Sequence, residues 1–353
     1  MTQSTTLPLD PQPGLYNHPA LPTRHSYPVA IRGAGIVTAF GLLMRTLPYA
    51  LVRFAILVAF SVATILWFVV TFGGGAWLGA RLAVPIGWVW IIGGLCLYGY
   101  VWQTILRYAL HLIECGHVAV LTELITRGSL RSGGQGMFAY GRQIVRAKFG
   151  EATLLFGLHT LVRGVVGAFN RTLDFLGELL PVPGLEVVMR IINLILRAAT
   201  RYIDKAIFSY NLARGDENPW RSSRDGLVYY CQNAKEILKT ATWTVVLDRV
   251  LTVLAWIVLL APSAALALAL PESVRNLGTI VYILIAALFA SNIRAAFIKP
   301  LFLIMVIVKF HTMIEGQAIN ETWDSRLTQL SGQFAKIKEE AQAWAGATPK
   351  PVA

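Results

Sequence analysis

Hydrophobic positions gather in four long runs along this chain. They cover about 49–72, 84–106, 242–270 and 278–299. An apolar run of about 20 residues can cross the ~30 Å hydrocarbon core of a bilayer as a helix. The pattern therefore predicts an all-α fold: a polytopic α-helical integral membrane protein with amphipathic interfacial helices. Its transmembrane helical domain covers 49–310.

Polar positions in the middle of the chain, 150–212, follow a different pattern. Two helical stretches meet at a Pro-Val-Pro-Gly turn, which is typical of a helical hairpin. Polar residues recur at helical spacing along each: His159, Arg163, Asn170 and Asp174 on the first, and Arg190, Asn193, Arg197, Arg201 and Asp204 on the second. A helix with one such polar stripe lies flat among lipid headgroups, or stands upright with the stripe facing a bundle or cavity. Both alternatives remain open.

The two ends of the chain carry no comparable apolar run. Residues 1–48 contain seven prolines with polar residues between them, so we expect a disordered cytoplasmic tail. At the other end, 311–353 contains the amphipathic pattern Glu321–Trp344, which predicts a cytoplasmic amphipathic helix and tail.

Charge then supplies an orientation. Only 14% of residues are charged, against about 25% in soluble domains. Lys and Arg flank the runs mainly on one side, which predicts a plasma (inner) membrane protein with both termini cytoplasmic. The net charge of +12 has two explanations: it follows from that topology, or the basic residues form a surface that binds anionic lipid. The lipid bilayer is the expected partner, and isolated basic residues without a run do not favour nucleic acid.

The run Ser291–Phe310 carries two cations, Arg294 and Lys299. A cation at mid-membrane costs about 2.5–3.5 kcal/mol on insertion scales. Counting 1.5 Å per residue from the intervening turn places Asp248 level with Lys299, so we expect Asp248 to neutralise one of the two. The pair is then either a structural clamp or part of a polar vestibule. Pro300 predicts a kink, after which 301–308 tilts or lies along the inner interface.

Other candidate chemistry is sparse. His111, Glu114 and Cys115 share one helical arc, but His117 points elsewhere, so we expect no metal site. Three cysteines give no disulfide framework. No nucleotide-binding or hydrolase motif is present, and we expect neither an enzyme nor a cofactor.

Several short motifs near the C-terminal half occur in a known family. They are Tyr202-Ile203, Ala206-Ile207, Ser222 to Gly226, and the Val-Val-Leu-Asp-Arg-Val run at Val245–Val250. Together they resemble the C-terminal part of the choline transporter-like family, over about a third of the chain. The resemblance implies movement of choline or a similar small cation across the membrane.

Two functions are compatible with these observations. The first is a transporter-like or channel-like protein in which Asp248, Glu114 and Glu123 face a cationic solute, with Arg294 and Lys299 beside the path. Four to six spans make a thin bundle, so such a path predicts a homo-oligomer. The alternative is a non-transporting membrane scaffold, or a protein that binds anionic lipid through a basic cytoplasmic face. Stripes at Arg163 and Arg197 that share a cavity with Asp248 would favour transport.

Overall fold

The computed structural model describes residues 27–130, 134–149, 157–169, 202–214 and 218–344, and every regular element in these ranges is helical. The elements are α1 (Ile36–Arg45), α2 (Leu47–Arg81), α3 (Val84–Val101), the π-helical turn η1 (Trp102–Leu106), α4 (Arg107–Arg127), α5 (Met137–Phe149), α8 (Pro219–Gln232), α9 (Ala234–Leu268), α10 (Glu272–Ile293), the π-helical turn η2 (Arg294–Ile298), α11 (Lys299–Ile314), α12 (Glu321–Leu330) and α13 (Gly332–Ala343). Two further helical segments cover 157–169 and 202–214. The all-α prediction is confirmed for these ranges.

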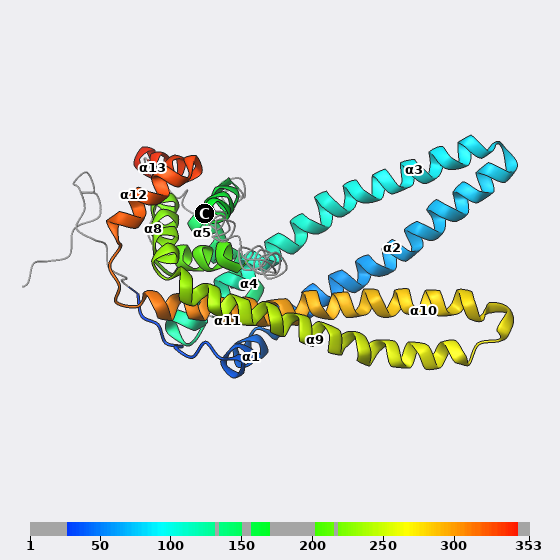
Figure 1. Cartoon of the computed structure of the whole chain (residues 1–353), viewed down its shortest axis with the longest axis horizontal. Helices are drawn as coiled ribbons and strands as arrows, with labels where there is room; N and C mark the ends of the chain where they lie inside the picture. The colour runs from blue at the N-terminus through cyan, green and yellow to red at the C-terminus, as the bar shows by residue number, and fades with distance from the viewer. Residues whose placement is uncertain (1–26, 131–133, 150–156, 170–201, 215–217, 345–353) are drawn as a thin grey trace, which may run out of the picture.

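Two long helical hairpins project from one side of a compact helical body (Figure 1). One hairpin is α2 with α3, and the other is α9 with α10. We call the compact body the head; it contains α1, α4, α5, α8, α11, α12, α13 and the segments 157–169 and 202–214. The hairpins lie close together at their bases and diverge toward their tips.

Four helices are long and apolar enough to cross a membrane. Three contain a predicted span completely, and the third along the chain ends a few residues before the predicted end at 270. The four helices cover Leu47–Arg81, Val84–Arg127, Ala234–Leu266 and Gly278–Ile314. Only 6% to 22% of their most apolar stretches is buried within the protein. Length, composition and this exposure are those of an integral membrane protein.

Glycine allows α2 and α3 to approach closely near their turn. A Cβ atom added to Gly87 would overlap the backbone carbonyl of Gly75. Further from the turn of this hairpin, the Trp67 indole Nε1 donates to the Gly94 carbonyl at 3.0 Å. Close backbone approach at small residues is a usual way to pack helices in lipid, and it makes this hairpin one unit.

Both hairpins connect to the head through a π-helical turn. The turn η1 joins α3 to α4, and η2 joins α10 to α11. Pro300 lies in the first turn of α11, directly after η2, where its missing N–H is tolerated because the wider turn has already shifted the hydrogen-bond register. The apolar stretch 301–308 is buried inside the head, at most 8% exposed. The expectation that it lies along a membrane interface is wrong: protein covers this stretch.

Residues 27–48 form part of the head, which contradicts the prediction of a tail over all of 1–48. Helix α1 packs against α11 and buries Ala39, Leu42 and Leu43. The backbone N–H of Ala30 donates to the Ile125 carbonyl at 2.9 Å. Five of the seven prolines precede residue 27, in the part that lies outside the described residues. The proline content on which the prediction of a tail depends is therefore concentrated before residue 27.

The predicted amphipathic helix 321–344 is divided into α12 and α13. Ser331 adopts an extended conformation between them and caps α13 through its hydroxyl, because a serine followed by a glycine favours a cap over a continuous helix. Asp324 of α12 accepts from Arg224 of α8 and Lys338 of α13, each at 2.7 Å. These ion pairs hold both short helices against α8.

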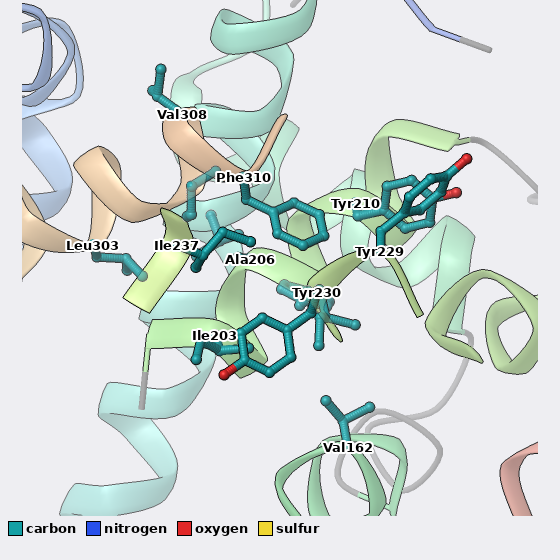
Figure 2. Close-up of a cluster of buried hydrophobic side chains, with 14 of the residues drawn as sticks. Val162, Ile203, Ala206, Tyr210, Tyr229, Tyr230, Ile237, Leu303, Val308 and Phe310 are labelled. Carbon is teal, nitrogen blue, oxygen red and sulfur yellow. The ribbon is translucent and has the colours of Figure 1, made fainter. Parts of the chain in front are cut away.

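The centre of the head is the segment 202–214 (Figure 2). Ile203, Ala206 and Tyr210 are almost completely buried, and they pack with side chains of α8, α9 and α11, among them Tyr229, Tyr230, Ile237 and Phe310. The segment 157–169 packs one face on this core and exposes the other. The described parts of the predicted hairpin 150–212 therefore pack on the protein core. The two alternatives, a hairpin flat among headgroups or an upright one with its stripe facing a bundle or cavity, stay predictions. Residues 170–201 lie outside the described residues.

Candidate functional site

The expected ion pair in the last hairpin is present, between Asp248 of α9 and Arg294 at the start of η2. The guanidinium Nε donates to Oδ1 at 3.2 Å, and a second nitrogen donates to Oδ2. Asp248 is buried, whereas Arg294 is partly exposed and Lys299 is exposed. Of the two cations that Asp248 could neutralise, the structure thus selects Arg294. The two-point contact clamps α9 to the π-helical turn at the base of the hairpin.

A second group of charges lies where the hairpins enter the head. Its members come from four elements, and we call it the charge cluster: Arg53, Glu114, His159, Arg163, Asp204 and Lys205. Arg163 Nε donates to Asp204 Oδ2 at 2.7 Å, and His159 Nδ1 lies 3.7 Å from the same oxygen. Lys205 Nζ lies 3.8 Å from Glu114 Oε2. The cluster thereby joins α4 to the segments 157–169 and 202–214.

Burial and neighbouring charge together set the ionisation of the cluster. Burial alone would raise the pKa of Asp204, but His159, Lys205 and Arg163 lower it, and the resulting pKa is about 2. Burial lowers the pKa of His159. For Lys205, burial acts to lower the pKa, but Glu114 and Asp204 outweigh it and raise the value. At neutral pH the aspartate and lysine are therefore charged, and the histidine is neutral.

Hydrogen bonding in the cluster is incomplete. Within the described ranges, four of its residues contain a buried nitrogen or oxygen atom without a hydrogen-bond partner: Arg53, His159, Asp204 and Lys205. Charge attraction between Lys205 and Glu114 at 3.8 Å thus replaces a direct hydrogen bond for this pair. Buried charges held in this way are sensitive to the loss of any one partner.

The predicted polar stripes meet in this cluster only in part. His159, Arg163 and Asp204 come together, as two helices with facing stripes would bring them. Arg163 contacts Asp204 and not Asp248. The other stripe residues lie outside the described residues: Asn170, Asp174, Arg190, Asn193, Arg197 and Arg201. A cavity shared by Arg163, Arg197 and Asp248 stays a prediction.

All three acids of the predicted cation path are in ion pairs. Asp248 pairs with Arg294, and Glu114 with Lys205. Glu123 lies near the end of α4 and pairs with Arg127 at 2.7 Å, one helical turn further along. In this conformation each carboxylate has a cation of the protein beside it.

A buried hydrogen-bond chain in the head was not anticipated from the sequence. Tyr27 Oη and His311 Nδ1 are 2.7 Å apart, His311 Nε2 and Ser209 Oγ 2.8 Å, and Ser209 Oγ and Thr122 Oγ1 2.7 Å. Ser209 and His311 are fully buried, so the serine hydroxyl is not accessible to a substrate here. The chain ties the N-terminal segment to α11, 202–214 and α4. No local pattern identifies it, because its members are far apart in sequence.

Comparison with known proteins adds no relative. The chain matches no family model, and no match to a curated protein or to a solved structure was found. The resemblance to the choline transporter-like family therefore stays a prediction.

Proposed function

We propose that this protein is a non-transporting membrane scaffold: two hairpins anchor a helical head at the inner surface of a membrane, and basic side chains at the base of the hairpins bind anionic lipid. The observation that carries the proposal is the pairing of all three candidate acids, Asp248, Glu114 and Glu123, with cations of the chain itself. Carboxylates neutralised in this way do not attract a passing cation.

The arrangement of the hairpins supports the same function. They diverge toward their tips (Figure 1), and their most apolar stretches are largely exposed. The hairpins suit an anchor that positions the head, and the basic flanks favour a cytoplasmic location for it.

Three exposed cations surround the base of the hairpins. Arg107, Arg249 and Lys299 lie roughly 29 to 42 Å from the turns of their hairpins at 1.5 Å per residue. This range begins at the edge of a ~30 Å hydrocarbon core, where lipid phosphates lie. A basic residue near an anionic leaflet contributes about 1 kcal/mol of attraction, so the three side chains suit an anionic headgroup surface.

We expect the triple substitution Arg107→Gln, Arg249→Gln and Lys299→Gln to reduce the anionic lipid that purifies with the protein. One kcal/mol corresponds to about fivefold in affinity per side chain. The measurement is the amount of phosphatidylglycerol retained in mild detergent, by mass spectrometry. The control is Lys336→Gln, an exposed cation on α13, which should retain the wild-type amount.

Two results would contradict the proposal. Unchanged phosphatidylglycerol in the triple variant would remove the lipid-binding role. Saturable uptake of labelled choline into sealed vesicles containing the wild-type protein would favour transport, as the family resemblance implies, through a path formed between chains.

A further inference from the structure

Helix α1 is apolar on both of its faces. One face packs on α11. The opposite face is exposed, and we call it the open face; its members are Ile36, Val37, Phe40 and Met44, with Val37 82% exposed. Within the described ranges, these four are half of the eight large apolar side chains exposed on the head, although α1 has only ten residues. Such a concentration is typical of a contact surface.

The open face continues into the exposed apolar surface of α2. Exposed side chains recur every four residues across the break between the two helices: Ile36, Phe40, Met44, Pro48 and Val52. A spacing of four follows one side of a helix, and the break is the single residue Thr46. Further exposed apolar residues extend along α2 toward its turn. The surface of α1 is thus continuous with that of a helix suited to lipid by length and composition.

The position of α1 also matches a membrane surface. It lies beside the base of both hairpins (Figure 1), because it directly precedes α2 and packs on α11. The 35 residues of α2 extend about 52 Å at 1.5 Å per residue. The hairpins diverge (Figure 1), so at least one is tilted, and a tilt of about 30° reduces this length to a depth of about 45 Å. That depth equals a bilayer with its headgroups. With the turn after Arg81 in one headgroup layer, α1 lies in the other.

Charge around α1 suits the same surface. The sequence contains no aspartate or glutamate between Asp10 and Glu114. Arg45 carries the single charge of α1 and is exposed at its end, beside the open face. Arg32, before the helix, is paired with Glu315 at 2.8 Å and adds little net charge. A short helix with an apolar face and a basic end is typical of the membrane interface.

We propose that α1 is an in-plane membrane helix whose open face inserts at the boundary between headgroups and acyl chains. The occupant of this face is the lipid of the leaflet on which the head lies. Together with the two hairpins, α1 gives the head a third attachment, which fixes how the head faces the membrane. The inference rests on the proposed anchoring of the head by the hairpins, and it is independent of transport.

Fluorescence quenching at single labelled cysteines tests the position of α1. The background is Cys96→Ser, because Cys96 is the exposed native cysteine, whereas Cys115 and Cys231 are buried. The full chain is placed in vesicles of phosphatidylglycerol and phosphatidylcholine, brominated either near the headgroup end or near the methyl end of the acyl chains. Each of three variants replaces one exposed apolar side chain with a cysteine that carries a fluorophore: Val37→Cys on the open face, Leu66→Cys near the middle of α2, and Leu330→Cys on α12.

Each position has its own expected pattern of fluorescence loss. At residue 37, bromine near the headgroup end should quench the fluorophore, and iodide in the water should not. At residue 66, bromine near the methyl end should quench most strongly, because this position lies deep in the bilayer. At residue 330, iodide alone should quench, because α12 lies away from the hairpins (Figure 1).

Three results would overturn the proposal. Quenching at residue 37 by iodide alone, as at residue 330, would place α1 in water and leave the anchoring by the hairpins intact. Protection of residue 37 from both quenchers would indicate that a second copy of the chain covers the open face in place of lipid. Absence of lipid quenching at residue 66 would contradict the anchoring itself, and the position of α1 with it.

Discussion

Asp204→Asn lowers the free energy of unfolding of the head by about 2–4 kcal/mol. The pKa of Asp204 is about 2 in the folded protein, against an ordinary value of 3.8. A difference of that size corresponds to roughly 2 kcal/mol of stabilisation at neutral pH. The substitution also leaves the buried Lys205 with Glu114 as its remaining carboxylate neighbour in the charge cluster, which adds to the loss. The measurement is chemical or thermal unfolding in mild detergent.

The acid dependence of stability identifies the origin of this effect. Because the folded-state pKa of Asp204 lies below the unfolded value, its contribution is complete above about pH 5 and is lost as the pH falls toward 2. Stability of the Asp204→Asn variant should therefore fall less steeply than that of the wild type in this range. Glu339→Gln, an exposed substitution on α13, should change neither stability nor slope. Equal slopes for wild type and Asp204→Asn would contradict the assignment.

Asp248→Asn has the second largest expected effect, a loss of about 1–3 kcal/mol. The substitution removes the negative charge from a buried carboxylate and leaves the Arg294 guanidinium partly buried without it. Thermal unfolding in mild detergent measures the change. The matched control is Glu272→Gln at the other end of the same hairpin, where Glu272 is 91% exposed and lies 3.9 Å from Arg275. That exposed pair contributes little to stability, so the control should unfold like the wild type. If the Asp248→Asn variant also unfolds like the wild type, the structural role assigned to the Asp248–Arg294 pair is wrong.

The elements that the sequence predicts well are those set by the bilayer. A helix must be long and apolar enough to cross a membrane, and this requirement is visible in one contiguous segment. Counting helical rise also predicts that Asp248 meets a cation of the next helix, but it places Asp248 level with Lys299, whereas the structure pairs it with Arg294. The count differs because α10 begins at Glu272, earlier than the turn assumed from the sequence. These predictions depend on local composition and on one turn.

The head could not be predicted in the same way. The stretch 301–308 is as apolar as a lipid-facing helix, so hydropathy does not separate protein core from lipid contact. The segment 202–214 becomes the centre of the core through contacts with α8, α9 and α11, which periodicity within 150–212 does not reveal. Lys205 in particular carries no sequence signal for its place beside Glu114, 91 residues earlier. Long-range packing decided these features.

The central claim is that both hairpins cross a bilayer and hold the head on one side of it. Labelling of single cysteines with a membrane-impermeant maleimide tests this directly in sealed vesicles. Ser273→Cys marks the α9–α10 turn and Glu339→Cys marks the head, and both positions are exposed. We predict that reagent on one side labels residue 273 alone and that reagent on the other side labels residue 339 alone. Labelling of both from the same side would contradict the account.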